Sequence, residues 1–233
     1  MQKLVILSGA GMSAESGLKT FRDMGGLWEN YDVMEVASPQ GWNRDMELVL
    51  KFYNERRAQL KDAHPNEGHL GLVELEKYFD VHIITQNVDN LHEQAGSKKV
   101  LHLHGILTRV RSIGDENLVY DIGYKSINKG DNCEKGFQLR PDIVWFGEAV
   151  PAMDEACRIA SQADIFVVIG SSLVVYPAAS LVQYAPSNAP VFVIDPNEVN
   201  TPSGRKIEYI KEPAGKGVKV LTEKLQTYMK HSE

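Results

Sequence analysis

The chain has 233 residues, 43% apolar and 24% charged side chains, and a formal net charge of −6. This length predicts one domain, or one domain with a small insertion, that buries a substantial core, and the acidic balance disfavours nucleic acid as a partner. No apolar run is long enough for a membrane span or a secretory signal, and two cysteines give no disulfide framework, so we expect no membrane partner and a cytoplasmic location.

Five short apolar runs have the β-branched and leucine-rich character of strands that are buried on both faces. They are residues 3–8, 81–86, 100–104, 164–170 and 190–195. Helical patterns lie between or after them, at residues 44–60, 66–78, 151–162 and 214–229. Strands that alternate with helices predict an α/β fold with a doubly wound parallel sheet.

One stretch, residues 106–136, interrupts this alternation. It is polar, with two short β-like pieces and the loop cluster KGDNCEKG. We interpret it as a small insertion module whose hairpin-like pieces pack around Ile113, Leu118, Val119 and Tyr120.

The first predicted strand leads into residues 9–14 (GAGMSA), which fit the dinucleotide-binding pattern G-x-G-x-x-G/A. Glycines allow the backbone to approach a pyrophosphate, and the helix N-terminus that follows supplies free N–H donors. The motif alone equally allows a glycine-rich turn that binds nothing.

The second predicted strand runs out into four polar residues, Gln86, Asn87, Asp89 and Asn90. They stand at the strand's carboxyl end, where α/β sheets place ligands, and their side chains can hydrogen-bond a carboxamide and sugar hydroxyls. The alternative is helix capping by Asp89 or Asn90, which needs no ligand.

His102 and His104 alternate near the end of the third predicted strand and so share a sheet face. Two histidines without a third ligand are a weak metal signal. The strand-end position favours His104 as a general base, because a neutral imidazole there reaches the same crevice as Gln86 and Asp89. A structural role is the alternative for both histidines.

Two further stretches border the same crevice. Residues 170–179 (GSSLVVYPAA) follow a strand and offer N–H and hydroxyl donors. Residues 141–148 (PDIVWFGE) are apolar and end in Gly-Glu, which fits either the wall of a substrate channel or core packing.

Together, five stretches resemble the sirtuin family of NAD-dependent protein deacylases: GAGMSAESGLKTFRD, TQNVDNLH, the HG of LHLHG, RPDIVWFGE and GSSLVVYPA. They run in the family's order from residue 9 to residue 179. The resemblance implies one catalytic domain of a bacterial sirtuin over residues 1–233, with a Rossmann-type sheet and small-domain insertions at about 29–64 and 106–140. NAD and an acyl-lysine protein or peptide would lie in the cleft between the sheet and the insertions.

The resemblance also implies roles for particular residues. His104 would be the general base, and Asn87 would act with it at the nicotinamide pocket. The residues implied to bind NAD are Gly9, Ala10, Gly11, Ser13, Phe21, Arg22, Trp28, Gln86, Asn87, Val88, Asp89, Gly170, Ser171, Ser172, Asp195, Pro196, Asn197 and Ala214. Those implied to hold the acyl-lysine are Val144, Phe146, Gly147 and Glu148.

The implied chemistry consumes NAD as an electrophile rather than as a hydride carrier. The acyl oxygen of the modified lysine displaces nicotinamide, and His104 takes a proton from a ribose hydroxyl. The products are deacylated lysine, nicotinamide and O-acyl-ADP-ribose. Exclusion of water matters because hydrolysis would waste NAD.

The chain departs from the family at the zinc site. Most members carry two C-x-x-C pairs in the small domain, a strong tetrahedral zinc signature. Here the insertion contains only Cys133, Ser112 falls near the expected start of the first pair, and no histidine lies between His104 and Arg140. We therefore predict no structural zinc. Cys157, on a predicted helix, is expected to be a small buried hydrophobe.

A second feature concerns the choice of acyl group. Tyr53 and Arg56 are three residues apart on a predicted helix and so project from one face. The pair resembles the Tyr-x-x-Arg that marks desuccinylase and demalonylase sirtuins, and Ala14 matches their wider acyl pocket. A guanidinium and a hydroxyl suit an acyl carboxylate, although deacetylation is also expected. The alternative is an ordinary helix with a solvated arginine.

Two rival functions differ in class. A Rossmann dehydrogenase would place an acid after the second strand, whereas this strand ends in the amides Gln86 and Asn87. A non-catalytic acyl-lysine binding module would not need His104.

Overall fold

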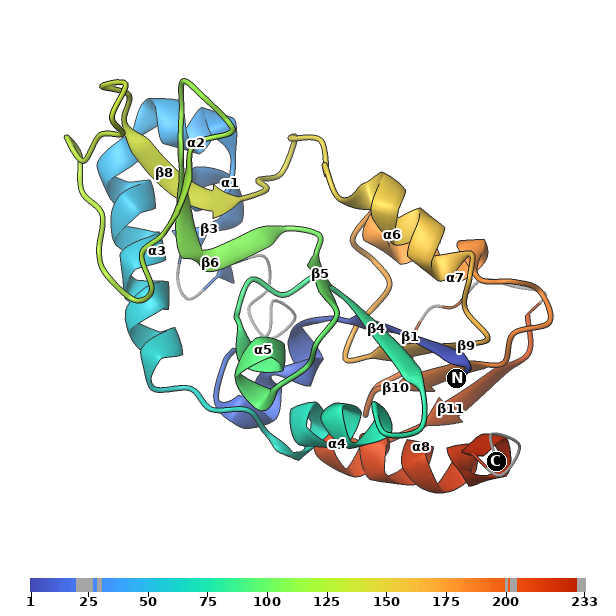
Figure 1. The fold of residues 1–233 in the computed structure, drawn as a ribbon. Coiled ribbons are helices and arrows are strands. Elements are labelled where there is room, and N and C mark those ends of the chain that lie inside the picture. The colour runs from blue at the N-terminus through green and yellow to red at the C-terminus, as the bar shows by residue number, and fades with distance from the viewer. Residues whose placement is uncertain (20–26, 29–30, 200, 202–204, 230–233) are drawn as a thin grey trace.

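The computed structural model of the chain describes residues 1–19, 27–28, 31–199, 201 and 205–229, the side chains at 27, 28 and 229 excepted. Figure 1 shows a parallel sheet with helices on both faces and, beside it, a smaller module in which three helices accompany an antiparallel sheet. Phe21 and Arg22, which the resemblance implies to bind NAD, lie outside the described residues.

Six parallel strands form the main sheet in the order β11-β10-β9-β1-β4-β5. Their bounds are β1 Lys3–Ser8, β4 Asp80–Thr85, β5 Val100–His102, β9 Ile165–Ile169, β10 Val191–Ile194 and β11 Ile207–Ile210. The chain runs outward from β1 through β4 and β5, then returns beside β1 and continues outward from β9. The topological switch point therefore lies between β1 and β9, where such sheets bind ligands.

Helices cover the two faces of this sheet (Figure 1). One face carries α4 (Glu67–Leu75) and α8 (Ala214–Met229), and the other carries α6 (Met153–Ala160) and α7 (Leu181–Tyr184). Strand β1 shows why both faces are covered: Leu4 and Ile6 pack into the cluster under α4 and α8, while Val5 and Leu7 pack into the cluster under α6 and α7. The predicted doubly wound parallel sheet is confirmed.

The smaller module is built from two separate parts of the sequence. Its helices are α1 (Val33–Val36), α2 (Pro39–Arg44) and α3 (Met46–Lys61). Its antiparallel sheet has the order β7-β6-β8, with β6 at Gly105–Ser112, β7 at Val119–Asp121 and β8 at Leu139–Ile143. Side-chain caps at Asp32, Ser38 and Asp45 begin the three helices in turn.

The core of this module differs from the prediction. Ile113 and Val119 are 49% and 41% exposed, so they do not form its centre. The buried cluster instead joins Leu107 and Val110 of β6 to aromatic and aliphatic side chains of α3. Of the residues predicted to form the centre, Tyr120 is half-buried and packs against this cluster. The insertion therefore shares its core with the helical part.

Other elements depart from the sequence expectations in detail. The strand predicted to reach residue 104 ends at His102, and Cys157 is only partly buried. Short elements not predicted include β11, an edge strand, and α5 (Leu91–Ala95). The remaining short elements are β2 (Leu27–Trp28), β3 (Tyr31–Asp32) and the 3-10 turns η1 (Ala10–Met12), η2 (Ala14–Ser16) and η4 (Ala178–Ser180).

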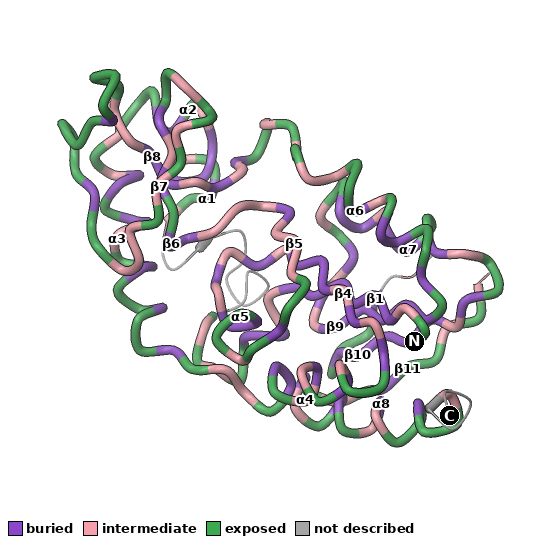
Figure 2. The backbone as a smooth tube through the Cα atoms, in the orientation of Figure 1, coloured by how far each residue is buried: buried purple, intermediate pink, exposed green. Residues whose placement is uncertain are grey.

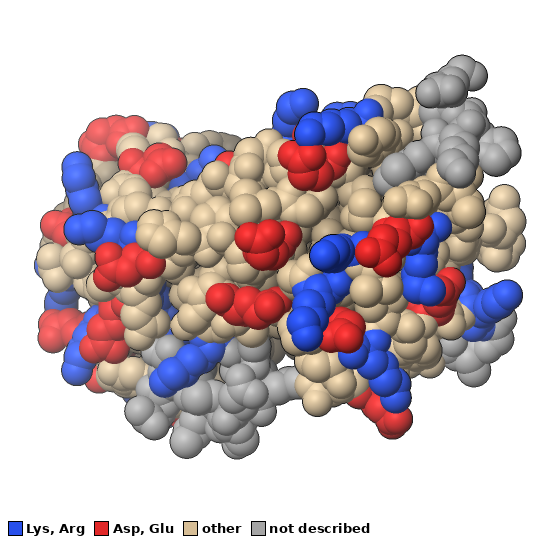
Figure 3. Space-filling view, turned by 90° about the horizontal axis from the view of Figure 1, so that it is seen from below, with Lys and Arg blue, Asp and Glu red and all other residues tan. Residues whose placement is uncertain are grey.

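Burial and charge follow this layout. Figure 2 shows buried backbone concentrated in the strands of the main sheet and exposed backbone on the outer turns. On the face in Figure 3, acidic and basic side chains are interspersed, and neither sign forms a broad field. Among the described residues, no helix has the length and apolar character needed to cross a bilayer.

Candidate active site

A cleft of about 960 Å³ lies between the main sheet and the smaller module. One wall comes from the loops that follow β1, β4, β9 and β10, which all leave the carboxyl edge of the sheet. The other wall comes from α3 and from the segment after β8. Ligand sites in open α/β sheets occupy this carboxyl edge.

The glycine-rich loop after β1 packs directly on the loop after β9. A Cβ at Gly11 would lie 2.7 Å from the Cα of Gly170, and a Cβ at Gly9 would lie 2.7 Å from its carbonyl oxygen. Gly170 itself has φ +60, which favours glycine. Glycine is therefore required here by backbone contact, and the result is a floor without side chains between β1 and β9.

A chain of hydrogen bonds ties this loop to the end of β4. Asn87 Nδ2 donates to Ser13 Oγ at 3.1 Å, and Ser13 Oγ donates to Asp89 Oδ2 at 2.9 Å. The second carboxylate oxygen of Asp89 accepts the backbone N–H of Leu91 at the start of α5. Burial raises the pKa of Asp89, although both hydrogen bonds oppose the shift. The three side chains are thus fixed in one orientation beneath the cleft.

The same residues settle the capping alternative. Asp89 does cap α5, while the side chain of Asn90 makes no capping bond. Because Asp89 caps the helix and also lines the cleft, the two interpretations are compatible. Gln86 adds a further link, donating from Nε2 to Ser171 Oγ at 2.8 Å.

His104 lies just beyond β5 and lines the cleft. Its Nδ1 is 3.0 Å from the carbonyl oxygen of Gln86. A carbonyl only accepts, so Nδ1 carries the hydrogen and Nε2 is left as the basic nitrogen. Burial lowers the pKa of His104, which keeps the imidazole neutral near pH 7.

His102 does not line the cleft and holds the local structure together. Its Nδ1 is 3.1 Å from the carbonyl oxygen of Asn87, and its Nε2 is 2.7 Å from Glu93 Oε1. His102 therefore has a structural role, which is the alternative that the sequence left open.

Polar residues after β10 border the far end of the cleft. Asp195, Pro196 and Asn197 all line it, and the N–H of Asn197 donates to Asp195 Oδ1 at 2.9 Å. Ala214 does not line the cleft; it is 4% exposed and packs near Gly68, and the preceding Pro213 lines the wall in its place.

The opposite end of the cleft is aromatic and basic. Tyr53 and Arg56 of α3 both line it, with exposed fractions of 0% and 8%. The Arg56 guanidinium lies 4.7 Å above the ring of Phe52, within the range of a cation–π contact. Tyr53 Oη accepts a hydrogen bond of 3.0 Å from Trp145 Nε1. The prediction that Tyr53 and Arg56 share one face of α3 is confirmed.

An ion pair holds the segment after β8. Glu148 contacts the guanidinium of Arg140 at 2.7 and 3.2 Å and accepts the backbone N–H of Trp145 at 2.8 Å. The Arg140 guanidinium in turn lies 3.3 Å above the Trp145 ring. Burial alone would raise the pKa of Glu148, but its bonds to Arg140 and Trp145 outweigh this and lower it.

Most of the residues singled out from the sequence meet at this cleft. Those that line it are Gly9, Ala10, Gly11, Ser13, Ala14, Tyr53, Arg56, Gln86, Asn87, Val88, Asp89, His104, Val144, Phe146, Gly147, Glu148, Gly170, Ser171, Ser172, Asp195, Pro196 and Asn197. The side chain of Trp28 is not described, and Ala214 lies behind the wall.

Several lining residues were not predicted. They include Glu15, Gln59, Leu107, Trp145, Tyr176 and Glu198. Trp145 stands inside the quoted motif PDIVWFGE, so its neighbours could have indicated it. Nothing local marks Gln59, which lines the cleft one turn beyond Arg56.

Cys133 and Ser112 of the insertion are joined by a hydrogen bond. Cys133 Sγ lies 3.3 Å from Ser112 Oγ, so the two positions singled out in the sequence are neighbours. Within the described part of the chain, no group of three or more His, Cys, Asp or Glu side chains could hold a metal ion.

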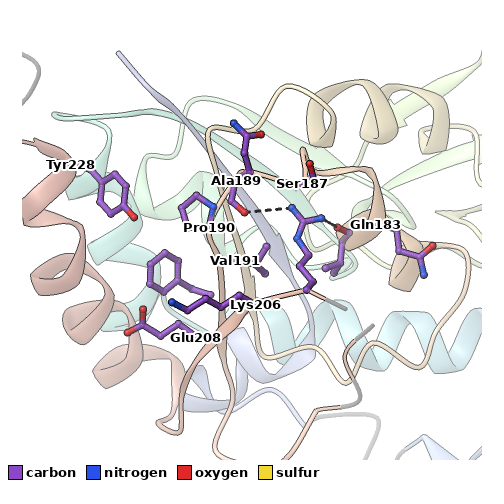
Figure 4. A pocket seen from close by; sticks show the side chains of 12 residues that line it. Gln183, Ser187, Ala189, Pro190, Val191, Lys206, Glu208 and Tyr228 are labelled. Carbon is purple, nitrogen blue, oxygen red and sulfur yellow. Dashed lines mark hydrogen bonds between the residues drawn. The ribbon is translucent and has the colours of Figure 1, made fainter. Parts of the chain in front are cut away.

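A second pocket, of about 630 Å³, lies at the amino-terminal edge of the same sheet (Figure 4). Its most basic side chain, Arg205, donates to the carbonyl oxygens of Val182, Ala185, Pro186 and Ala189. This guanidinium therefore holds the end of α7 and the segment that follows it, and its donors are occupied by these carbonyl oxygens.

Comparisons with known proteins agree with this geometry. The model of the Sir2 family matches residues 9–177. An NAD-dependent protein deacylase of Helicobacter pylori is 54% identical over 225 residues, which cover 97% of this chain and 98% of the relative. The structure of a complex of a Sir2 homologue with NAD superposes with a TM-score of 0.87 and 39% identity, covering 97% and 90% of the two chains.

A third match, the structure of Sir2Tm bound to a propionylated peptide, has a TM-score of 0.79 and 30% identity and covers 95% and 92% of the two chains. A doubly wound sheet with a glycine-floored cleft at its switch point, closed by a smaller module, defines a dinucleotide-dependent enzyme. The chain belongs to the Sir2 family, the sirtuins.

Proposed function

We propose that this NAD-dependent protein deacylase removes acidic acyl groups, succinyl and malonyl, from lysine side chains and also acts on acetyl-lysine. The observation that carries the proposal is the presence of Tyr53 and Arg56 in the wall of the cleft. A guanidinium presents two parallel N–H donors that match a carboxylate, and a phenol adds a third donor. An acetyl group offers no carboxylate to these donors.

The cleft fits NAD as the co-substrate. In the described chain, the backbone N–H groups of Ala10 and Ser172 meet no acceptor and stand on the glycine floor, where a pyrophosphate needs donors. Asp195 borders the end suited to the adenosine ribose, and its carboxylate can accept ribose hydroxyls. NAD supplies an anomeric carbon with nicotinamide as its leaving group.

The residues of this chain then have distinct tasks. Asn87 and Asp89, oriented through Ser13, would hold the nicotinamide carboxamide. His104 would accept a ribose hydroxyl proton at Nε2, since its Nδ1–H is engaged by Gln86. The wall formed by α3 would keep bulk water from the NAD ribose while nicotinamide is displaced. One water is consumed afterwards to release the lysine amine, so the products would be the free lysine, nicotinamide and O-acyl-ADP-ribose.

The domain boundaries and the other site roles form part of this proposal. The chain is one catalytic domain, residues 1–233, with small-domain insertions at about 29–64 and 106–140. Val144, Phe146 and Gly147 would hold the acyl-lysine chain beside Glu148. The hydrogen bond between Cys133 and Ser112 would take the place of the structural zinc that most family members bind.

The test compares succinyl-lysine and acetyl-lysine peptides of one sequence with wild-type protein and with Arg56→Met. Methionine keeps an unbranched apolar side chain but removes the N–H donors of the guanidinium. The kcat/KM for succinyl-lysine is therefore expected to fall about 100-fold relative to that for acetyl-lysine, which corresponds to the loss of hydrogen bonds to a charged group. Arg158→Met on exposed α6 is the matched control. Unchanged succinyl turnover in Arg56→Met would show that the acyl assignment is wrong.

A primary deacetylase is the second candidate. It predicts equal or greater turnover of acetyl-lysine by the wild type, with Arg56→Met affecting both peptides alike.

A further inference from the structure

Among the described residues, the hydroxyl of Tyr53 has one hydrogen-bond partner, and the identity of this partner determines where the phenolic hydrogen points. Trp145 Nε1 lies 3.0 Å from Tyr53 Oη, and the two side chains are 2% and 0% exposed. An indole N–H can only donate, so Tyr53 Oη is the acceptor in this bond. Among the described residues, no acceptor receives the phenolic hydrogen of Tyr53.

The indole itself is held from three sides. Arg140 lies 3.3 Å above its ring, Trp42 packs with a ring-centroid distance of 5.6 Å, and the backbone N–H of Trp145 donates to Glu148 at 2.8 Å. The ion pair between Arg140 and Glu148 closes this set of contacts. The direction of the Trp145 N–H is therefore fixed by its neighbours before any ligand binds.

We propose that Trp145 is a positioning residue for acyl specificity: its N–H occupies one lone pair of Tyr53 Oη and so directs the phenolic hydrogen into the cleft, toward the carboxylate of an acidic acyl group. The inference rests on the proposed preference for acidic acyl groups and names a residue outside the Tyr-x-x-Arg pair. Trp145 and Tyr53 both line the cleft beside Arg56, so the three groups face one volume.

Two physical effects make this arrangement selective. A hydroxyl that accepts a hydrogen bond becomes a better donor, because consecutive hydrogen bonds polarise one another. Burial raises the pKa of Tyr53 far above neutrality, so the phenol keeps its hydrogen throughout the working range of pH. A carboxylate gains from this oriented donor, and an acetyl methyl group gains nothing.

The experiment measures the ratio of kcat/KM for succinyl-lysine to kcat/KM for acetyl-lysine in Trp145→Phe, Tyr53→Phe and the double variant. Trp145→Phe keeps an aromatic ring and removes the N–H, and we expect the ratio to fall about five- to tenfold. Tyr53→Phe lowers it at least as much. The double variant matches Tyr53→Phe alone, because the N–H has no hydroxyl left to orient.

Tyr78→Phe is the control. It removes a phenolic hydroxyl from a half-exposed ring that does not line the cleft, so the ratio stays within about twofold of the wild type. If Trp145→Phe lowers the thermal midpoint, benzothienylalanine at position 145, which has sulfur in place of the N–H, is measured in its place.

The outcomes separate the inference from the function on which it rests. If Tyr53→Phe lowers the ratio while Trp145→Phe leaves it within about twofold of the wild type, as Tyr78→Phe does, the positioning role is wrong and the acyl preference stands. The same conclusion follows if the two effects multiply in the double variant. If the wild type shows no preference for succinyl-lysine and Tyr53→Phe changes nothing, the proposed function fails.

Discussion

The bond between Glu148 and Arg140 allows a quantitative test of what holds the substrate segment in place. Arg140 is 9% exposed, and the side chain of Glu148 is 21% exposed. In Glu148→Gln the charge is lost while the shape is kept, so two charge-assisted contacts at 2.7 and 3.2 Å become weaker and leave the guanidinium poorly paired. Breaking a buried pair by changing one partner costs about 3–5 kcal/mol, which partial exposure of Glu148 reduces to about 2–4 kcal/mol.

Thermal unfolding of the ligand-free protein measures this loss. For a chain of this size, about 2–4 kcal/mol corresponds to a thermal midpoint lowered by roughly 5–15 °C at pH 7. Glu155→Gln is the control, because Glu155 pairs with Arg158 at 3.4 Å while both side chains are more than half exposed, and its effect stays below about 0.5 kcal/mol.

The same variant has a predicted pH dependence. The folded protein lowers the pKa of Glu148 below its ordinary value of 4.5, so the unfolded chain binds its proton first as pH falls. The stabilisation from Glu148 is therefore fully present above pH 4.5 and is lost progressively as pH falls below it. The difference in thermal midpoint between wild type and Glu148→Gln narrows over the same range. A midpoint shift equal to that of Glu155→Gln would show that the Arg140–Glu148 pair does not stabilise the segment. A difference in thermal midpoint that stays constant down to about pH 3 would show that Glu148 has no lowered pKa in the folded protein.

Two further predictions concern the base and the metal. Because burial lowers the pKa of His104 from 6.5, we expect kcat/KM to stay level as pH falls to 6.5 and to decline only below it. We also expect His104→Ala to abolish deacylation while peptide binding, measured by fluorescence anisotropy, is retained. Full activity in His104→Ala would contradict the role of His104 as the base. Incubation with a metal chelator is expected to leave the thermal midpoint within about 1 °C of the untreated protein, and loss of structure on chelation, with zinc found by elemental analysis, would overturn the expectation of a zinc-free small domain.

The parts of the fold that could be predicted are those with a strong local signal. Strand β1 is apolar at every position that faces a helical layer, so its burial on both faces can be read from Leu4 to Leu7 alone. Strand β11 has two exposed residues among four and lies at the sheet edge, so its pattern is too weak to distinguish from a loop.

The site divides in the same way. Gln86, Asn87 and His104 could be found because each lies at or directly after the end of a predicted strand, and carboxyl strand ends meet at one edge of a parallel sheet. The bond between Trp145 and Tyr53 joins residues 92 positions apart. Periodicity carries no information about such a pair, because it arises only when β8 and α3 pack together.

The central claim is tested most directly by competition in a single reaction. Equal amounts of a succinyl-lysine and an acetyl-lysine peptide of the same sequence are incubated with the protein and limiting NAD. The O-acyl-ADP-ribose products are then separated and quantified by mass spectrometry. We expect nicotinamide release with O-succinyl-ADP-ribose in excess over O-acetyl-ADP-ribose. Equal amounts of the two products, or an excess of the acetyl product, would contradict it.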